Sequence, residues 1–153
     1  MSHEWRRDGY TISTDRGLLD LTAIHGYLSR SYWAAEIPIE LVRRSLEHSV
    51  CFGIYHDGRQ VGFGRVITDL ATFGYIGDVY VLEEYRGRGL SKWLMECVEA
   101  HPDLQGFRRW MLVTRDAHEL YRRYGFETPA RPESYMERVV PDCYRRSAKP
   151  ASE

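Results

Sequence analysis

A glycine-rich turn with two arginines is the first stretch of this sequence that could do chemistry. It runs Arg86-Gly87-Arg88-Gly89-Leu90-Ser91, after a run of branched and aromatic residues and before a helical apolar stripe. The first N–H groups of a helix have no partner inside it, and the helix dipole adds positive potential there. The glycines let the backbone approach an anion closely, and the arginines can add charge-assisted hydrogen bonds to phosphate. The turn therefore predicts a phosphate site.

The same turn has a plainer interpretation, a tight strand-to-helix connection whose arginines are merely solvated. Its spacing is neither GxGxxG nor GxxxxGK[ST], which disfavours a nicotinamide cofactor or a nucleoside triphosphate. A single Arg-Gly-Arg-Gly is also no RNA-binding tract, because such tracts depend on repetition. The turn alone leaves the ligand open.

A second motif stands one predicted helix and one predicted strand downstream. It reads Ala117-His-Glu-Leu-Tyr121-Arg-Arg-Tyr-Gly125-Phe126. Together with Arg86-x-x-Gly89-x-Ser91, it resembles the GNAT family of acyl-coenzyme A-dependent N-acetyltransferases, in which both motifs occur in this order and spacing. The resemblance covers Val50 to about Val140. The serine at position 91 departs from the family's usual Gly or Ala.

The resemblance implies a donor, acetyl-coenzyme A, and the residues that bind it. The turn 86–91 is expected to hold the pyrophosphate, and the backbone of Val79 and Val81 to meet the pantetheine arm. Thr114 stands where the family often has an Asn near the coenzyme. The strand at 110–114 is expected to splay from the strand at 75–82, which leaves a slot for the thioester.

Two residues are candidates for moving protons. By the resemblance, Tyr121 protonates the departing thiolate; packing of the short helix is the alternative. Asp78 lies in a predicted strand whose alternation puts it on one face with Ile76 and Tyr80, opposite Val79 and Val81. Apolar neighbours raise a carboxyl pKa, which suits a general base or a docking site for an amine. The alternative is an ion pair with a nearby arginine such as Arg65.

The acceptor is less defined by the sequence. In the family the first helices and their connection wall the acceptor pocket, and here that stretch holds Tyr32, Trp33 and Glu36. Aromatic and acidic residues together could bind an amine through stacking and charge. They could equally pack a helix end onto the sheet. An amino acid, a polyamine, an aminoglycoside-like drug and a protein terminus all remain open as acceptors.

The elements that must position these residues follow from hydrophobic periodicity. The sequence predicts a mixed α/β (α+β) domain with a twisted mixed sheet and helices on both faces, as in GNAT proteins. Residues 50–82 should form an antiparallel meander of three strands, with a hairpin turn at His56–Arg59 between the first two. A capping box of Asp116 and Glu119 should begin the last helix, which should run through Tyr124. The expected strands are 10–15, 50–55, 60–68, 72–82, 110–114 and one from 126, and the expected helices begin near 20, 38, 90 and 116.

Size and composition limit the number of domains, the kinds of ligand and the location that the sequence allows. The 153 residues suit one domain, assigned to residues 10–141, with a loosely ordered N-terminus at 1–9 and a C-terminal tail at 142–153. A net charge of −1 disfavours a nucleic-acid binder. Three cysteines without CxxC spacing disfavour disulfides and metal. The start has no apolar run typical of a signal peptide, and no run is long enough for a membrane span, so a cytoplasmic protein is expected.

We therefore predict an N-acetyltransferase that moves acetyl from acetyl-coenzyme A to a primary amine by direct attack, without a covalent enzyme intermediate. A homodimer is expected from the family resemblance. One alternative is a sensor that binds acyl-coenzyme A without turnover, which would not need Tyr121. Another is an interaction module, which would not bind coenzyme A at all.

Overall fold

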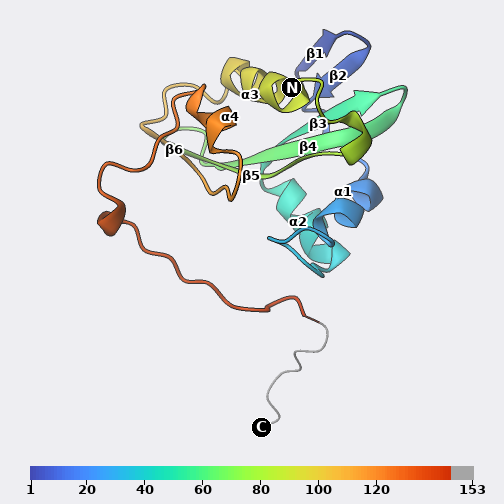
Figure 1. Cartoon of the computed structure of the whole chain (residues 1–153). Coiled ribbons are helices and arrows are strands. Elements are labelled where there is room, and N and C mark those ends of the chain that lie inside the picture. Colours follow the sequence, from blue (N-terminus) through green and yellow to red (C-terminus); the bar gives the residue numbers. More distant parts are fainter. Residues whose placement is uncertain (146–153) are drawn as a thin grey trace.

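The structure is a computed structural model that describes residues 1–145, and it shows one six-stranded sheet with helices on both faces. Helices α1 and α2 cover one face, and α3 and α4 lie on the other (Figure 1). The expected mixed α/β domain is confirmed. The strands are β1 (Glu4–Arg7), β2 (Tyr10–Ser13), β3 (Val50–His56), β4 (Arg59–Thr68), β5 (Phe73–Val81) and β6 (Arg109–Leu112); the helices are α1 (Leu21–Leu28), α2 (Ile39–Glu47), α3 (Leu90–Ala100) and α4 (His118–Arg122).

The strands lie in the sheet in their sequence order. Strands β1 to β5 pair antiparallel with their neighbours, and β6 pairs parallel with β5. The predicted hairpin between β3 and β4 is confirmed: Asp57 and Gly58 have φ of 50° and 75°, as a tight two-residue turn requires. A parallel pair needs a crossover, and α3 supplies it between β5 and β6.

Local sequence explains where the helices begin. Asp20 caps α1, because its carboxylate accepts the N–H of Ala23 at 3.0 Å. Pro38 stands immediately before α2, where its missing N–H costs nothing. The apolar stripe predicted for α3 is the buried face of that helix.

Two apolar clusters lie on opposite faces of the sheet. The cluster toward α3 and α4 contains Ile76 and Val81 of β5 together with Trp93 and Leu94. The cluster toward α1 and α2 contains Phe63 and Tyr80. Strand β5 therefore contributes to both faces, and its residues can reach two different environments.

The N-terminus departs from the sequence prediction. Residues 1–9 were expected to be loosely ordered, but Glu4–Arg7 pairs with β2 as an edge strand. Trp5 explains the difference, since its ring stacks on Phe52 of β3 with centroids 6.2 Å apart. Contact with a distant strand orders a segment whose own sequence is mostly polar.

Two predictions for the C-terminal third are wrong. The capping box does not form: α4 has Ala117 at its N-cap without a side-chain cap, and the helix ends at Arg122 rather than near Tyr124. The strand expected from Phe126 onward is also absent among residues 126–145, which contain only a short 3-10 turn, Pro132–Ser134. Three prolines in that segment, at 129, 132 and 141, remove the N–H donors that a strand needs.

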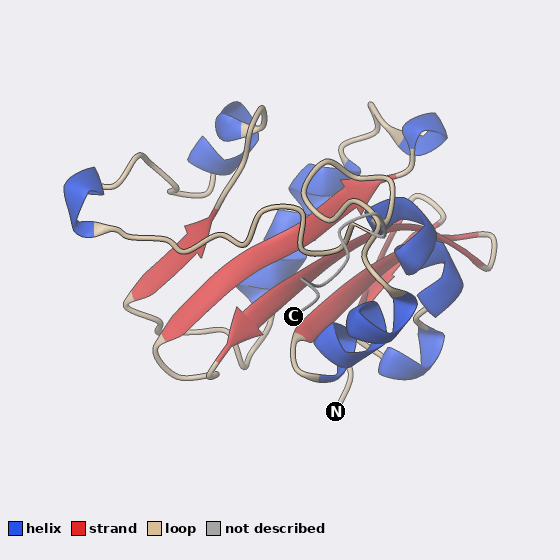
Figure 2. Cartoon of the chain, turned by 90° about the horizontal axis from the view of Figure 1, so that it is seen from below, coloured by secondary structure: helices blue, strands red, loops and turns tan. Residues whose placement is uncertain are grey.

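The C-terminal segment, residues 127–145, instead runs below the sheet on the side of α1 and α2 (Figures 1 and 2). The predicted tail begins at residue 142, and its last eight residues, 146–153, lie outside the described part of the chain. Within residues 1–145, no helix is long and apolar enough to cross a membrane.

Candidate functional site

A cleft of about 1350 Å³ lies on the α1 and α2 side of the sheet. Its floor is β5, and one wall is the connection between α1 and α2. The opposite wall is the connection from β6 to α4, which contains Thr114, together with Tyr121 of α4. Glu137 and Tyr144 of the C-terminal segment also line it. The motif residues that are far apart in sequence therefore surround one space.

The cleft exists because β5 and β6 separate. Their pairing starts at Phe73 with Arg109 and ends at Ile76 with Leu112. Beyond that pair, β5 continues to Val81 without a strand partner on the β6 side, so its backbone there faces the cleft. The splayed slot expected from the family resemblance is present.

A bulge on β5 accompanies this separation. Arg65 of β4 pairs with Gly77, but Phe63 pairs with Tyr80, so β5 has one extra residue between them. Asp78 has φ of 54°, in the left-handed region, which is uncommon for a residue other than glycine.

The bulge corrects the faces predicted for β5. Ile76 was expected on the face of Asp78 and Tyr80, but it packs in the cluster toward α3 with Val79 and Val81. Asp78 shares only the face of Tyr80, toward α1 and α2. Simple alternation fails here because the extra residue resets the side-chain order.

The glycine-rich turn leads into α3 as expected. Gly87 and Gly89 have φ of 79° and 77°, and Gly89 is the N-cap without any side-chain cap. The first helical hydrogen bond runs from Trp93 N–H to Gly89 O at 3.0 Å. The three N–H groups before it, of residues 90–92, have no partner within residues 1–145. They form an open anion site.

The two arginines of the turn differ. Arg86 donates from Nε to Val81 O at 2.9 Å and from Nη2 to the Tyr27 hydroxyl at 2.8 Å, so it braces the turn against β5 and α1. The Tyr27 ring in turn stacks on Tyr80 with centroids 4.0 Å apart. Arg88 is exposed and makes no ion pair within the described residues, so its charge is available at the turn.

The other predicted coenzyme residues fall into two groups. Ser91, Val79, Val81 and Thr114 line the cleft. The side chain of Leu90 is buried in the core, so only its backbone can contribute to a site. The Thr114 hydroxyl accepts the Ala117 N–H at 3.0 Å and shapes the turn before α4.

Tyr121 lies at the cleft wall with 8% of its surface exposed. Its hydroxyl makes no hydrogen bond within residues 1–145. Burial, and then the nearby Tyr32 hydroxyl, raise the pKa of Tyr121 above its ordinary value, which keeps the phenol protonated at neutral pH. Tyr124 points elsewhere, as expected: its hydroxyl donates to Lys92 O on α3 at 3.0 Å.

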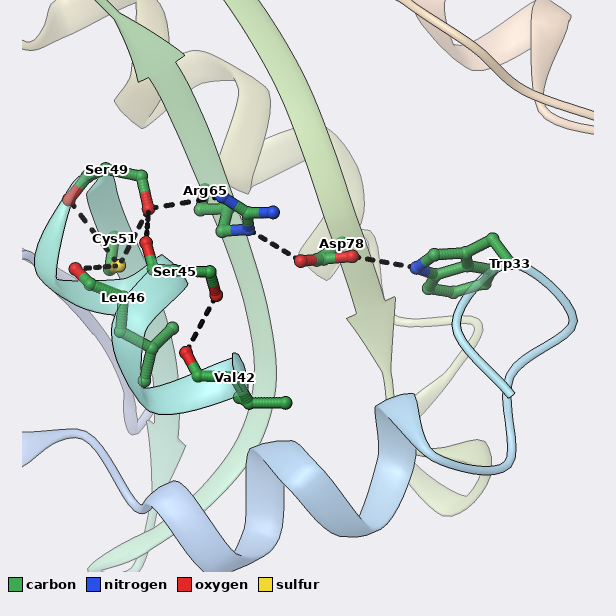
Figure 3. A network of polar contacts seen from close by, with 8 residues as sticks. All are labelled: Trp33, Val42, Ser45, Leu46, Ser49, Cys51, Arg65 and Asp78. Carbon is green, nitrogen blue, oxygen red and sulfur yellow. Dashed lines mark hydrogen bonds and ion pairs between the residues drawn. The ribbon is translucent and has the colours of Figure 1, made fainter. Parts of the chain in front are cut away.

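Asp78 is held by two partners (Figure 3). Its Oδ2 accepts from Arg65 Nε at 2.6 Å, and its Oδ1 accepts from the Trp33 indole Nε1 at 2.8 Å. The side chains of Arg65 and Asp78 are only 17% and 13% exposed. The structure therefore shows the ion pair that the sequence left as the alternative, and it adds a hydrogen bond to the connection between α1 and α2.

The three residues proposed to bind the acceptor do not all line the cleft. Tyr32 and Trp33 line the cleft, and the Arg115 guanidinium lies over the Tyr32 ring at 3.8 Å. Glu36 does not line the cleft; it is exposed on the same connection with φ of 65°. The residues that sequence reasoning missed are Arg44 and Arg115. Neither of them belongs to a motif, so only the fold brings them to the cleft.

No group of three or more His, Cys, Asp or Glu side chains within residues 1–145 could hold a metal ion.

Comparison with known proteins agrees with this arrangement. The profile of the acetyltransferase (GNAT) domain matches residues 47–128, more than half of the chain. A Gibberella zeae protein assigned to the acetyltransferases, FG08082, is 36% identical over 140 residues, which cover 76% of this chain and 78% of that protein.

Solved structures share the fold. A Xanthomonas campestris protein assigned to the GNAT acetyltransferases is 57% identical, with a TM-score of 0.88 over 92% of this chain and 99% of that one. A Clostridium acetobutylicum protein is 15% identical, with a TM-score of 0.58 over 91% of this chain and 96% of its own, and shows likeness of fold alone. The chain therefore belongs to the GNAT family of acetyltransferases.

Proposed function

We propose that this protein transfers an acetyl group from acetyl-coenzyme A directly to a primary amine. One observation carries the proposal: the splayed strands, the uncapped start of α3 and the Tyr121 hydroxyl meet at a single cleft. A phosphate site, a slot for an extended chain and a proton donor are the three parts that this reaction needs in one place.

The donor side is assigned to the turn and the open edge of β5. The free N–H groups at the start of α3 and the Arg88 charge suit a pyrophosphate. The edge of β5 from Asp78 to Val81 has no strand partner on the β6 side, which suits the amide groups of pantetheine. The C. acetobutylicum structure, which has the same fold, was determined with acetyl-coenzyme A, and this supports the donor.

The chemistry is a direct acyl transfer. The amine nitrogen attacks the thioester carbonyl, the C–N bond forms, the C–S bond breaks, and the nitrogen loses one proton. Tyr121 gives its proton to the departing thiolate and regains one from solvent. Free thiols titrate near a pKa of about 8.5, so the thiolate is already a fair leaving group. We expect protonation to contribute about 10²- to 10³-fold, within the usual range for general acids.

Asp78 is assigned a positioning task rather than that of a general base. Both of its carboxylate oxygens already accept hydrogen bonds, from Arg65 Nε at 2.6 Å and from Trp33 Nε1 at 2.8 Å. The bond to Trp33 ties the connection between α1 and α2 to the bulge on β5. Asp78 thus holds the acceptor wall beside the strand that borders the thioester slot. Tyr32 and Trp33 supply the aromatic surface of that wall.

The first experiment is a calorimetric titration of the protein with acetyl-coenzyme A, followed by an amine panel with detection of the released thiol. Binding with turnover supports the transferase. Binding without turnover on any amine would favour a sensor of acyl-coenzyme A. The absence of binding would favour an interaction module.

The assembly and location of the protein are also proposed. A homodimer is supported by large apolar side chains left exposed near β6 and on the C-terminal segment, including Val113 at 78% and Met136 at 97%. A light-scattering mass close to the 17.9 kDa of one chain would contradict it. A cytoplasmic location is supported by three cysteines that are all free.

A further inference from the structure

One end of the cleft is lined by α2. Four residues spaced along one face of this helix line the cleft: Leu41, Arg44, Ser45 and His48. The last turn of α2 contacts β4, because Arg65 Nη1 donates to Ser49 Oγ at 3.4 Å, and that hydroxyl donates to Ser45 O at 2.6 Å (Figure 3). This end therefore presents basic side chains from a helix and from the sheet together.

The cleft as a whole carries more positive than negative groups. Five arginines and one histidine line it, against two aspartates and one glutamate. Four of these arginines already have partners in the protein: Arg30 pairs with Glu83, Arg65 with Asp78, Arg86 with Val81 O and Tyr27, and Arg115 with the Tyr32 ring. Arg44 makes no hydrogen bond or ion pair within residues 1–145.

Other residues already fill the structural roles that Arg44 could have on α2. Arg43 binds both Glu40 and Glu47, the acids of the neighbouring turns. The carbonyl of Leu46 and that of Ser49, at the end of α2, accept from Arg16. Arg44 lowers the pKa of Glu40 only as a minor cause, after the hydrogen bond from Arg43, and it forms no ion pair with that acid. The C-terminal carbonyls of α2 do not require Arg44 either. The hydrogen-bond donors of the Arg44 guanidinium are therefore available to a ligand in the cleft.

Arg65 has donor capacity that the protein does not use. Its Nε and Nη1 are engaged, but Nη2 has no partner within the described residues. The side chain is 17% exposed, at the cleft floor. A partly desolvated guanidinium donates strong, charge-assisted hydrogen bonds to an anion. Asp78, which could repel an anion, is already neutralised by this same arginine.

We propose that the acceptor is an amine that also carries an anionic group, a carboxylate or a phosphate, and that Arg44 and Arg65 bind this group. This deepens the proposed function and rests on it. His48, one turn after Arg44, also lines the cleft. The anion sits between α2 and β4, and the amine reaches toward the slot between β5 and β6. The inference excludes polyamines and polycationic drugs from the acceptors left open by the sequence.

The test uses matched pairs of amines that differ only in the anion. Amino acids with a terminal amine, from glycine to 6-aminohexanoate, are compared with their methyl esters, and 2-aminoethyl phosphate is compared with ethanolamine. Spermidine represents the polycations. Thiol release gives kcat/KM, and calorimetry on the coenzyme A-loaded protein gives binding without turnover. We expect kcat/KM to be at least tenfold higher for the anionic amine than for its neutral counterpart, either in the carboxylate series or in the phosphate pair. The series that shows the difference identifies the anionic group.

Arg44→Ala and Arg43→Ala form the variant pair, since they remove the same charge from adjacent positions. Arg44→Ala should lower kcat/KM for the anionic amine by about 10- to 100-fold, the usual weight of a hydrogen bond to a charged group. It should leave the neutral amine and the affinity for acetyl-coenzyme A unchanged. Arg43→Ala should change none of these. A lower melting temperature without a change in selectivity would mean that Arg44 only stabilises α2, and would overturn the proposal.

Other outcomes separate this proposal from the function it rests on. If acetyl-coenzyme A binds and neutral or polycationic amines react as well as anionic ones, the anion site is wrong and the transferase stands. If acetyl-coenzyme A binds but no anionic amine either binds or reacts, the anion site is again wrong. If acetyl-coenzyme A does not bind at all, the proposed function itself fails.

Discussion

The two ends of the cleft are built in different ways. The donor end is one continuous stretch of chain, the turn 86–91, and it presents mainly backbone N–H groups. The acceptor end is assembled from side chains of four separate segments: the connection between α1 and α2, the last turn of α2, β4 and the bulge on β5. A site made of backbone depends on glycines and helix geometry. A site made of side chains depends on contacts that span the fold.

This difference explains how one fold can keep a common donor and vary the acceptor. Replacing a side chain at the acceptor end changes shape or charge without disturbing the turn. The two ends meet through few links, among them Arg86, which binds both Val81 O and the Tyr27 hydroxyl on α1. Variants at either end should therefore have separable effects.

The largest effect is expected where the two ends meet, at Tyr121. Tyr121→Phe keeps the ring and its packing but removes the proton. We expect kcat to fall about 10²- to 10³-fold, with little change in the affinity for either substrate and with loss of the alkaline limb of the pH–rate profile. Steady-state kinetics and calorimetry on one preparation measure this. A preserved kcat with a lowered melting temperature would show that Tyr121 only packs the short helix and does not donate a proton.

The next effect is confined to the donor end. Gly89→Asp puts a carboxylate at the start of α3 and should weaken acetyl-coenzyme A binding by about 10- to 100-fold, since hydrogen bonds to a charged ligand are lost. Gly58→Asp is the matched control, because Gly58 has φ of 75° against 77° for Gly89, and a Cβ meets no atom within 4 Å at either position. Equal affinities of the two variants for acetyl-coenzyme A, measured by calorimetry, would show that the pyrophosphate does not bind at this turn.

A smaller effect tests the acceptor end. Asp78→Asn keeps an acceptor for the Trp33 indole and removes the charge that Arg65 binds. If Asp78 positions the wall, the acceptor KM should rise by about tenfold while kcat and coenzyme affinity change little, since a buried charged hydrogen bond is worth roughly 1.5–3 kcal/mol. If Asp78 is instead the general base, kcat falls and the acidic limb of the pH–rate profile disappears. Trp33→Phe should reproduce only the first pattern.

The smallest effect lies outside both ends, at His101. Burial, and then the charge of His3, lower the pKa of His101 below the ordinary 6.5, and its Nδ1 accepts the Asp103 N–H at 3.1 Å. The unfolded chain therefore binds a proton at higher pH than the folded one. The stabilisation is complete above pH 6.5 and is lost as the pH falls through the lower folded pKa.

The measurement is urea unfolding between pH 7.5 and about 5, with His101→Asn, which retains an acceptor but does not titrate. We expect His101→Asn to reduce the loss of unfolding free energy as the pH falls. His118→Asn, at an exposed position, should leave that loss unchanged. Acetyl-coenzyme A affinity should be the same for all three proteins. A change in affinity for His101→Asn would show that this region is coupled to the cleft.

Much of the donor end could be predicted from the sequence. The turn, the helix that follows it and the strand before it depend on residues that are neighbours in the chain, so glycine positions and an apolar stripe suffice. The order of the helices and the three-strand meander followed from the same periodicity. The task of Arg86 was harder to predict, because its partners Val81 O and Tyr27 are set by how α1 packs on β5.

The acceptor end could be named only in part. Tyr32 and Trp33 were found because the family resemblance places the acceptor pocket at this connection, but Glu36 on the same connection does not line the cleft. Arg44 carried no local signal, since a basic residue near the end of a helix is common. The pairing of Asp78 depended on a bulge that alternation does not reveal.

The sequence by itself determined the class of fold and the glycine-rich turn that begins α3, because both depend on consecutive residues whose conformations are set by local sterics and periodicity. The family resemblance pointed to Tyr121. The tertiary structure alone decided that β1 pairs and which charges in the cleft are neutralised. Those outcomes depend on contacts between residues far apart in the chain. Such contacts form only when the whole sheet is assembled, and no local pattern specifies them.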